Sequence, residues 1–118
     1  MEEQKIKKAH APDLWAEVKA QIKLTCESIT AVSPASIIRE EHDINSLTLR
    51  NGKTGQAVSV NFSVDEPCIL YEGPVAGRKR ISFGVSADGN SVRLLMNEIP
   101  YSAEEIAIML TKRVTGAS

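Results

Sequence analysis

The sequence predicts an α+β domain, in which an N-terminal and a C-terminal helix pack on one face of a single antiparallel sheet of about five or six strands. Three observations support this: a helical apolar period over residues 12–32, short alternating segments over the next sixty residues, and a helix-capping signature near the end. Each strand offers one apolar face and each helix one apolar stripe, so two layers bury both. Short turns favour sequential strand neighbours, which makes the sheet a meander.

The first helix is expected over residues 12–32. Apolar or small side chains at positions 14, 18, 22, 25, 29 and 32 recur at helical spacing, and Asp13 is placed to cap the N-terminus. The helix should end at Ser33-Pro34, because the residue before a proline avoids the helical region. Residues 1–11 are polar and have few apolar groups to offset the entropy of ordering, which predicts a flexible tail before a single domain over 12–116.

The middle of the chain has the period of two that is typical of strands. Strands are expected from residue 37 and over 47–50, 58–64, 68–71, 81–86 and 92–96, with turns at Asn51-Gly52 and Asp88-Gly89. The charged residues at 40–42 indicate that the first strand ends at an edge or in water.

The final helix has the clearest local signals. Ser102 and Glu105 form a capping box, in which each side chain bonds the other's free backbone N–H group. An apolar stripe follows at positions 106, 109, 110 and 114, and Lys112 lies near the negative end of the helix dipole. Gly116 is placed to terminate the helix.

Composition excludes several broad classes. The 118 residues carry a net charge of −1, so no global field steers the protein to nucleic acid or to an anionic membrane. No apolar run reaches the roughly 20 residues that span a bilayer, and the N-terminus lacks the apolar core of a signal peptide. The two cysteines, Cys26 and Cys68, are too few for a disulfide framework. We therefore expect buried, reduced thiols and a cytoplasmic location.

The outer face of the sheet is the leading candidate for function. The residues that should point away from the helices are mostly small and polar, and the candidate binding surface comprises Arg50, Ser59, Asn61, Ser63, Ser82, Ser86 and Arg93. A face that is only solvated often carries more Lys and Glu. This pattern favours a non-enzymatic interaction or ligand-binding domain that docks a second copy as a homodimer, another protein or a polar ligand. A plain solvated face is the alternative.

Two other functions remain open from the sequence. The first is a small enzyme with a site near His42 and Asp65, where a histidine and a carboxylate could exchange a proton. The second is a weak nucleic-acid or anionic-lipid binder that uses the basic cluster Arg78, Lys79 and Arg80. Against the second, nucleic acid is unlikely as a partner, because no aromatic residues interleave with the cluster, and basic residues also protect sheet edges from aggregation.

The sequence predicts no cofactor and no metal site. Two histidines and two cysteines are scattered without ligand spacing. The stretch Gly52-Lys53-Thr54-Gly55 is a hairpin turn rather than a phosphate loop, because Leu47 occupies the position that a phosphate loop gives to glycine. Cys68 has acidic neighbours and is expected to be a core thiol, not a nucleophile.

Overall fold

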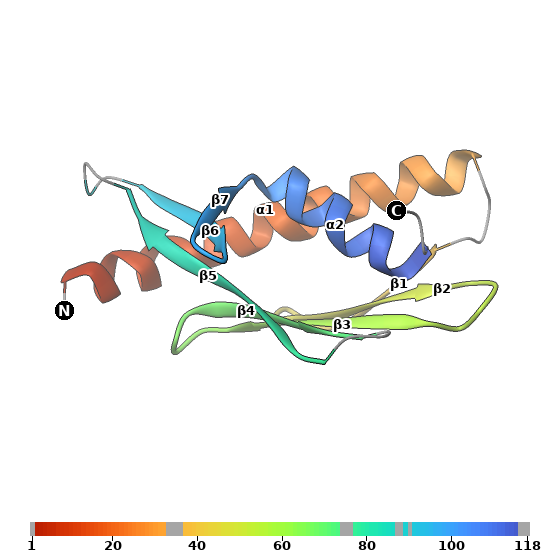
Figure 1. The fold of residues 1–118 in the computed structure, drawn as a ribbon, viewed down its shortest axis with the longest axis horizontal. Helices are drawn as coiled ribbons and strands as arrows, with labels where there is room; N and C mark the ends of the chain where they lie inside the picture. Colours follow the sequence, from red (N-terminus) through yellow and green to blue (C-terminus); the bar gives the residue numbers. More distant parts are fainter. Residues whose placement is uncertain (1, 33–36, 74–76, 87–88, 90, 116–118) are drawn as a thin grey trace.

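The computed structural model describes residues 2–32, 37–73, 77–86, 89 and 91–115. Two helices lie on one face of an antiparallel sheet (Figure 1), which confirms the predicted α+β class. The helices are α1 (Glu2–Val32) and α2 (Ala103–Thr115). The described strands, which neighbour one another in sequence order, are β1 (Ile37–Asp43), β2 (Ser46–Asn51), β3 (Ala57–Ser63), β4 (Cys68–Glu72), β5 (Lys79–Val85), β6 (Val92–Met96) and β7 (Ile99–Tyr101). The predicted stops at Ser33-Pro34 and Gly116 and the turn residue Asp88 lie outside the described residues.

Helix α1 begins ten residues earlier than predicted. Residues 2–11, expected to form a tail, are helical, and Pro12 lies inside α1. Three physical reasons support this: most residues of the segment are good helix formers, the side chain of Gln4 donates hydrogen bonds to the carbonyls of Asp65 and Glu66, and Ala11 is fully buried. The predicted start at Pro12 is therefore wrong. The flexibility of the first turns stays a prediction.

Strand β3, which has the clearest alternation of apolar and polar residues, shows which residues lie on each face of the sheet. In β3, Val58, Val60 and Phe62 are buried toward the helices, whereas Ser59 and Asn61 are exposed on the outer face. The register transfers this alternation to the neighbouring strands, because residues directly opposite each other share a face. The outer face therefore has the orientation that the sequence predicts.

The sheet has one strand more than the upper prediction. Strand β7 pairs with β6 through a hairpin whose two loop residues, Asn97 and Glu98, have φ values of 52° and 66°. Positive φ at both loop positions is the geometry of a tight hairpin turn, which sequences usually mark with Asn-Gly. The sequence did not predict this strand for three reasons: the turn has glutamate in place of glycine, β7 contains a proline, and β7 is only three residues long.

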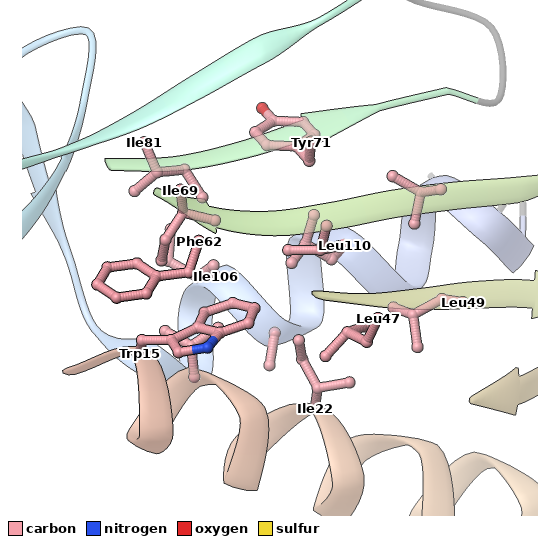
Figure 2. Packing of buried hydrophobic residues seen from close by; sticks show 14 of the residues in the cluster. Trp15, Ile22, Leu47, Leu49, Phe62, Ile69, Tyr71, Ile81, Ile106 and Leu110 are labelled. Atoms are coloured by element: carbon pink, nitrogen blue, oxygen red, sulfur yellow. The ribbon is translucent and has the colours of Figure 1, made fainter. Parts of the chain in front are cut away.

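The core lies between the two layers (Figure 2). Trp15 of α1 stacks on Phe62 of β3, with ring centroids 5.7 Å apart, and Phe62 meets Phe83 of β5 edge to face. The indole nitrogen of Trp15 donates to the carbonyl of Ile44 at 2.9 Å, and the Lys19 ammonium donates to the same oxygen. The turn between β1 and β2 is thus fixed to α1.

Helix α2 begins with the predicted capping box. The backbone N–H of Ser102 donates to the Glu105 carboxylate at 2.9 Å, and the backbone N–H of Glu105 donates to the Ser102 hydroxyl at 3.1 Å. At its other end, the side-chain amide of Asn51 donates to the carbonyl of Val114 at 3.1 Å. Both ends of α2 are therefore held, and the orientation of its exposed side is fixed. Neither described helix combines the length and apolarity that a membrane span requires.

Candidate functional site

A hollow of about 210 Å³ lies on the outer face over the centre of the sheet. It is lined by Ser59, Asn61, Leu70, Tyr71, Glu72 and Arg78. Cross-strand pairing creates it: Asn61 of β3 lies opposite Leu70 of β4, and Ser59 lies opposite Glu72. Arg78 comes from the segment that enters β5. The structure thus joins two residues of the predicted binding surface to one of the predicted basic cluster.

The polar groups around this hollow are unpaired within the part of the chain that the structure describes. The hydroxyl of Ser59, the amide of Asn61, the carboxylate of Glu72 and the guanidinium of Arg78 make no described hydrogen bond or ion pair, and all four residues are exposed. The hollow therefore offers donors, an anionic acceptor and a cation to a bound molecule at no cost in broken internal contacts.

Two arginines on the same face are paired within the chain. The guanidinium of Arg50 donates to the carboxylate of Glu40 at 2.9 Å, across the β1–β2 pair. Arg80 pairs with Glu66 at the opposite side of the hollow. Arg50, a residue of the predicted binding surface, therefore lies on the outer face but outside the hollow. Its guanidinium is already paired with Glu40.

The remaining predicted surface residues spread away from the hollow. Ser63 and Ser82 lie on either side of Cys68 in one row across β3, β4 and β5. Arg93 of β6 lies opposite Gly84 and is exposed. Ser86 follows the end of β5, where its hydroxyl accepts from the backbone N–H of Ser91, so it serves a turn. These residues do not converge on one site.

Cys68 is buried, but it lies on the outer face and not in the apolar core. Its register partners are Ser63 and Ser82, and it is not part of the main apolar cluster. Burial is the main cause that raises the pKa of its thiol; nearby Arg80 lowers the pKa and Glu66 raises it. The predicted burial of this thiol is confirmed, although the thiol lies on the outer face and not in the main apolar cluster. The signal for its face was weak because all four residues of 68–71 are apolar or aromatic, so the alternation is not visible.

The histidine and the carboxylate of the enzyme hypothesis are not joined. His42, on edge strand β1, shares a hydrogen bond of 2.7 Å with the hydroxyl of Thr48 on β2. Asp65 lies in the turn between β3 and β4, where its backbone carbonyl accepts a hydrogen bond from Gln4. No described hydrogen bond connects His42 with Asp65, so the geometry assembles no acid–base pair there.

The basic cluster divides over two faces. The register places Lys79 opposite the inward-facing Tyr71, whereas Arg80 lies opposite Leu70 on the outer face and is paired with Glu66. Only Arg78 lines the hollow. Strand β5 lies between β4 and β6, but the register with β6 covers only Ser82–Val85, so Lys79 and Arg80 pair on one side alone and their interpretation as edge protection stays a prediction.

No three His, Cys, Asp or Glu side chains among the described residues come together in a way that would hold a metal ion. None of the family models, curated proteins or solved structures with which the chain was compared matches it.

Proposed function

We propose that the protein is a non-enzymatic interaction domain that binds a polar segment of another protein through the hollow on its outer sheet face. The observation that carries the proposal is the convergence of unpaired Ser59, Asn61, Glu72 and Arg78 around one depression. A hollow of about 210 Å³ is smaller than the roughly 300–1,000 Å³ of most small-molecule sites, which favours a few side chains of a protein partner as its occupant.

The unpaired groups define the chemistry of that segment. Arg78 suits a carboxylate, with which a guanidinium forms charge-assisted hydrogen bonds, and Glu72 suits a basic side chain or a backbone N–H. Ser59 and Asn61 can each donate and accept, so they suit main-chain amides. Leu70 supplies an apolar floor between them. A short extended segment with one acidic side chain satisfies all of these groups.

A second copy of the chain is the alternative occupant of this face. Pairing of Arg50 with Glu40 and of Arg80 with Glu66 supports it, because two faces with internally neutralised charges approach each other without strong repulsion. A cytoplasmic location is also part of the proposal, supported by two free thiols that suit a reducing compartment.

Peptide-display selection against the immobilised protein tests the proposal. The binders are titrated against the wild type, Asn61→Arg, which fills the hollow with a bulky cation, and Gln56→Arg, which makes the same change in an exposed turn. We expect Asn61→Arg to weaken binding by about tenfold or more, as for a residue at the centre of an interface. Gln56→Arg should bind as the wild type does. Binders that do not distinguish the three proteins would contradict the proposal.

A further inference from the structure

The side of α2 that faces away from the core carries two half-buried apolar residues, Ile108 and Met109, between two exposed opposite charges. The buried side of the helix consists of Ile106, Ala107, Leu110, Thr111 and Val114. At about 3.6 residues per turn, Glu105 and Lys112 project in the same direction two turns apart, and Ile108 and Met109 lie between them on either side of the line. We call Glu105, Ile108, Met109 and Lys112 the α2 ridge.

A groove lies on each side of the α2 ridge. The larger, of about 530 Å³, separates α2 from the β6–β7 hairpin and is lined by Met96, Tyr101, Glu105, Ile108, Met109, Lys112 and Arg113. The smaller, of about 310 Å³, lies between α2 and α1. Leu24 in the smaller groove and Ile99 on the hairpin are each 55% exposed. A ridge flanked by grooves is the surface against which a second helix packs.

The charges of the α2 ridge are only partly used within the chain. One oxygen of the Glu105 carboxylate accepts the capping hydrogen bond from Ser102, and its other oxygen has no described partner. The Lys112 ammonium is exposed and likewise has no described hydrogen bond or ion pair. A partner for this surface therefore needs a cation near Glu105 and an anion near Lys112, on the two sides of an apolar centre.

The chain itself meets this requirement. A twofold axis across α2 between Ile108 and Met109 sets two copies of the helix antiparallel, and a twofold interface must be self-complementary. Glu105 then lies against Lys112 of the partner subunit, and the same pair recurs at the other end. Because the axis preserves the two sides of the helix, Ile108 meets Ile108 of the partner subunit on one side, and Met109 meets Met109 of the partner subunit on the other.

We propose that two copies of the protein associate through the α2 ridge in this antiparallel arrangement. Helix α2 has 13 residues and is too short to supply alone the roughly 1,200–2,000 Å² of a stable interface. Its flanks supply the rest: Leu24 of α1 on one side, and Met96, Ile99 and Tyr101 of the β6–β7 hairpin on the other. The proposal does not depend on the outer-face function, because the sheet and the helix layer face opposite directions (Figure 1).

Complementary charge reversal tests the proposal. In Glu105→Lys, and separately in Lys112→Glu, each of the two attractive pairs becomes a pair of like charges. The dimer dissociation constant measured by sedimentation equilibrium should rise by about tenfold to a hundredfold, given the modest energy of exposed pairs. An equimolar mixture of the two variants should recover dimers, because every reversed charge then faces an opposite charge. Glu3→Lys makes the same substitution at an exposed position near the start of α1, outside the ridge and both grooves, and should leave the dimer unchanged.

Circular dichroism of each variant shows whether it is folded, since Glu105→Lys also removes the capping bond. A folded mixture that remains monomeric while the wild type dimerises would overturn the antiparallel pairing. A wild type that stays monomeric over the whole concentration range would overturn the association itself.

Discussion

The outer sheet face and the exposed side of α2 use their charges in different ways. On the outer face, Arg50 and Arg80 are paired with glutamates of the same chain, and four unpaired polar groups gather at the hollow, while Arg93 lies apart from it. On α2, one carboxylate oxygen of Glu105 and the ammonium of Lys112 have no described partner, and they lie at the two ends of the α2 ridge. Opposite charges that flank apolar surface at matched spacing suit a symmetric partner. Mixed donors and acceptors around a small depression suit a polar segment of a different protein.

The connection after β4 links the two regions, and we expect its disruption to have the largest effect. Gly73 has a φ of 92°, and a Cβ there would lie 2.7 Å from the carbonyl oxygen of Ala57. Its own carbonyl accepts from the Arg113 guanidinium of α2. Gly73→Ala should lower the free energy of unfolding by about 3 kcal/mol, the sum of a left-handed backbone penalty and overpacking. Urea denaturation measures it.

Gly77→Ala is the matched control, because a Cβ at Gly77 meets nothing within 4 Å and its φ is not in the left-handed region. Equal stability of the two variants would show that the close approach at Gly73 is absent.

Two buried thiols, one on each side of the sheet, make stability depend on alkaline pH. Burial raises the pKa of Cys26 and of Cys68 above the ordinary value of 9.0. Above that pH the unfolded chain loses these protons while the folded chain keeps them, so the free energy of unfolding falls as pH rises. The expected slope is up to about 1.4 kcal/mol per pH unit for each thiol. Urea denaturation from pH 8 to 10 measures it, and a Cys26→Ala, Cys68→Ala double variant should show a shallower decline.

The reactivity of Cys68 can distinguish a glutamate that is paired within the chain, Glu66, from one that is unpaired, Glu72. Burial is the main cause that raises the pKa of the Cys68 thiol, and Glu66, which is paired with Arg80, raises it further. Glu66→Ala should therefore lower the pKa of this thiol. We expect modification by a thiol reagent to be faster than in the wild type, because a larger fraction of the thiol is ionised. In Glu72→Ala, which removes an unpaired carboxylate, the rate should stay at the wild-type value.

The N-cap holds the first turn of α2, which carries the α2 ridge. Among these predictions, we expect its loss to have the smallest effect on the free energy of unfolding. Ser102→Ala removes the hydroxyl that accepts from the backbone N–H of Glu105. The free energy of unfolding should fall by about 1 kcal/mol. Ser28→Ala, at an exposed position within α1, serves as the comparison in thermal denaturation. If both variants melt together, the capping bond does not stabilise α2.

The parts of the fold that depend on local signals could be predicted from the sequence. The capping box at Ser102 needs only residues three apart, and the alternation over 58–64 needs only its own apolar period. The helical start at Glu2 depends in part on the distant carbonyl of Glu66, and the position of Cys68 depends on the register with neighbouring strands. No pattern within either segment contains that information.

The candidate site likewise combines residues that a local pattern predicts with residues that only the strand pairing brings together. Ser59 and Asn61 were predicted because their strand alternates clearly. Their meeting with Glu72 and Arg78 depends on how β4 pairs with β3 and on where the segment before β5 lies. The α2 ridge was not predicted as a surface, since a stripe with Met109 suggests a core residue until its neighbours show which side is covered.

Light scattering over a concentration series, on the wild type, Ile108→Asp and Asn61→Arg, tests most directly whether the two regions have separate roles. We predict a dimeric mass for the wild type and for Asn61→Arg, and a monomeric mass for Ile108→Asp, which places a charge at the centre of the α2 ridge. A dimer that survives Ile108→Asp and is lost in Asn61→Arg would contradict this assignment and place self-association on the outer sheet face.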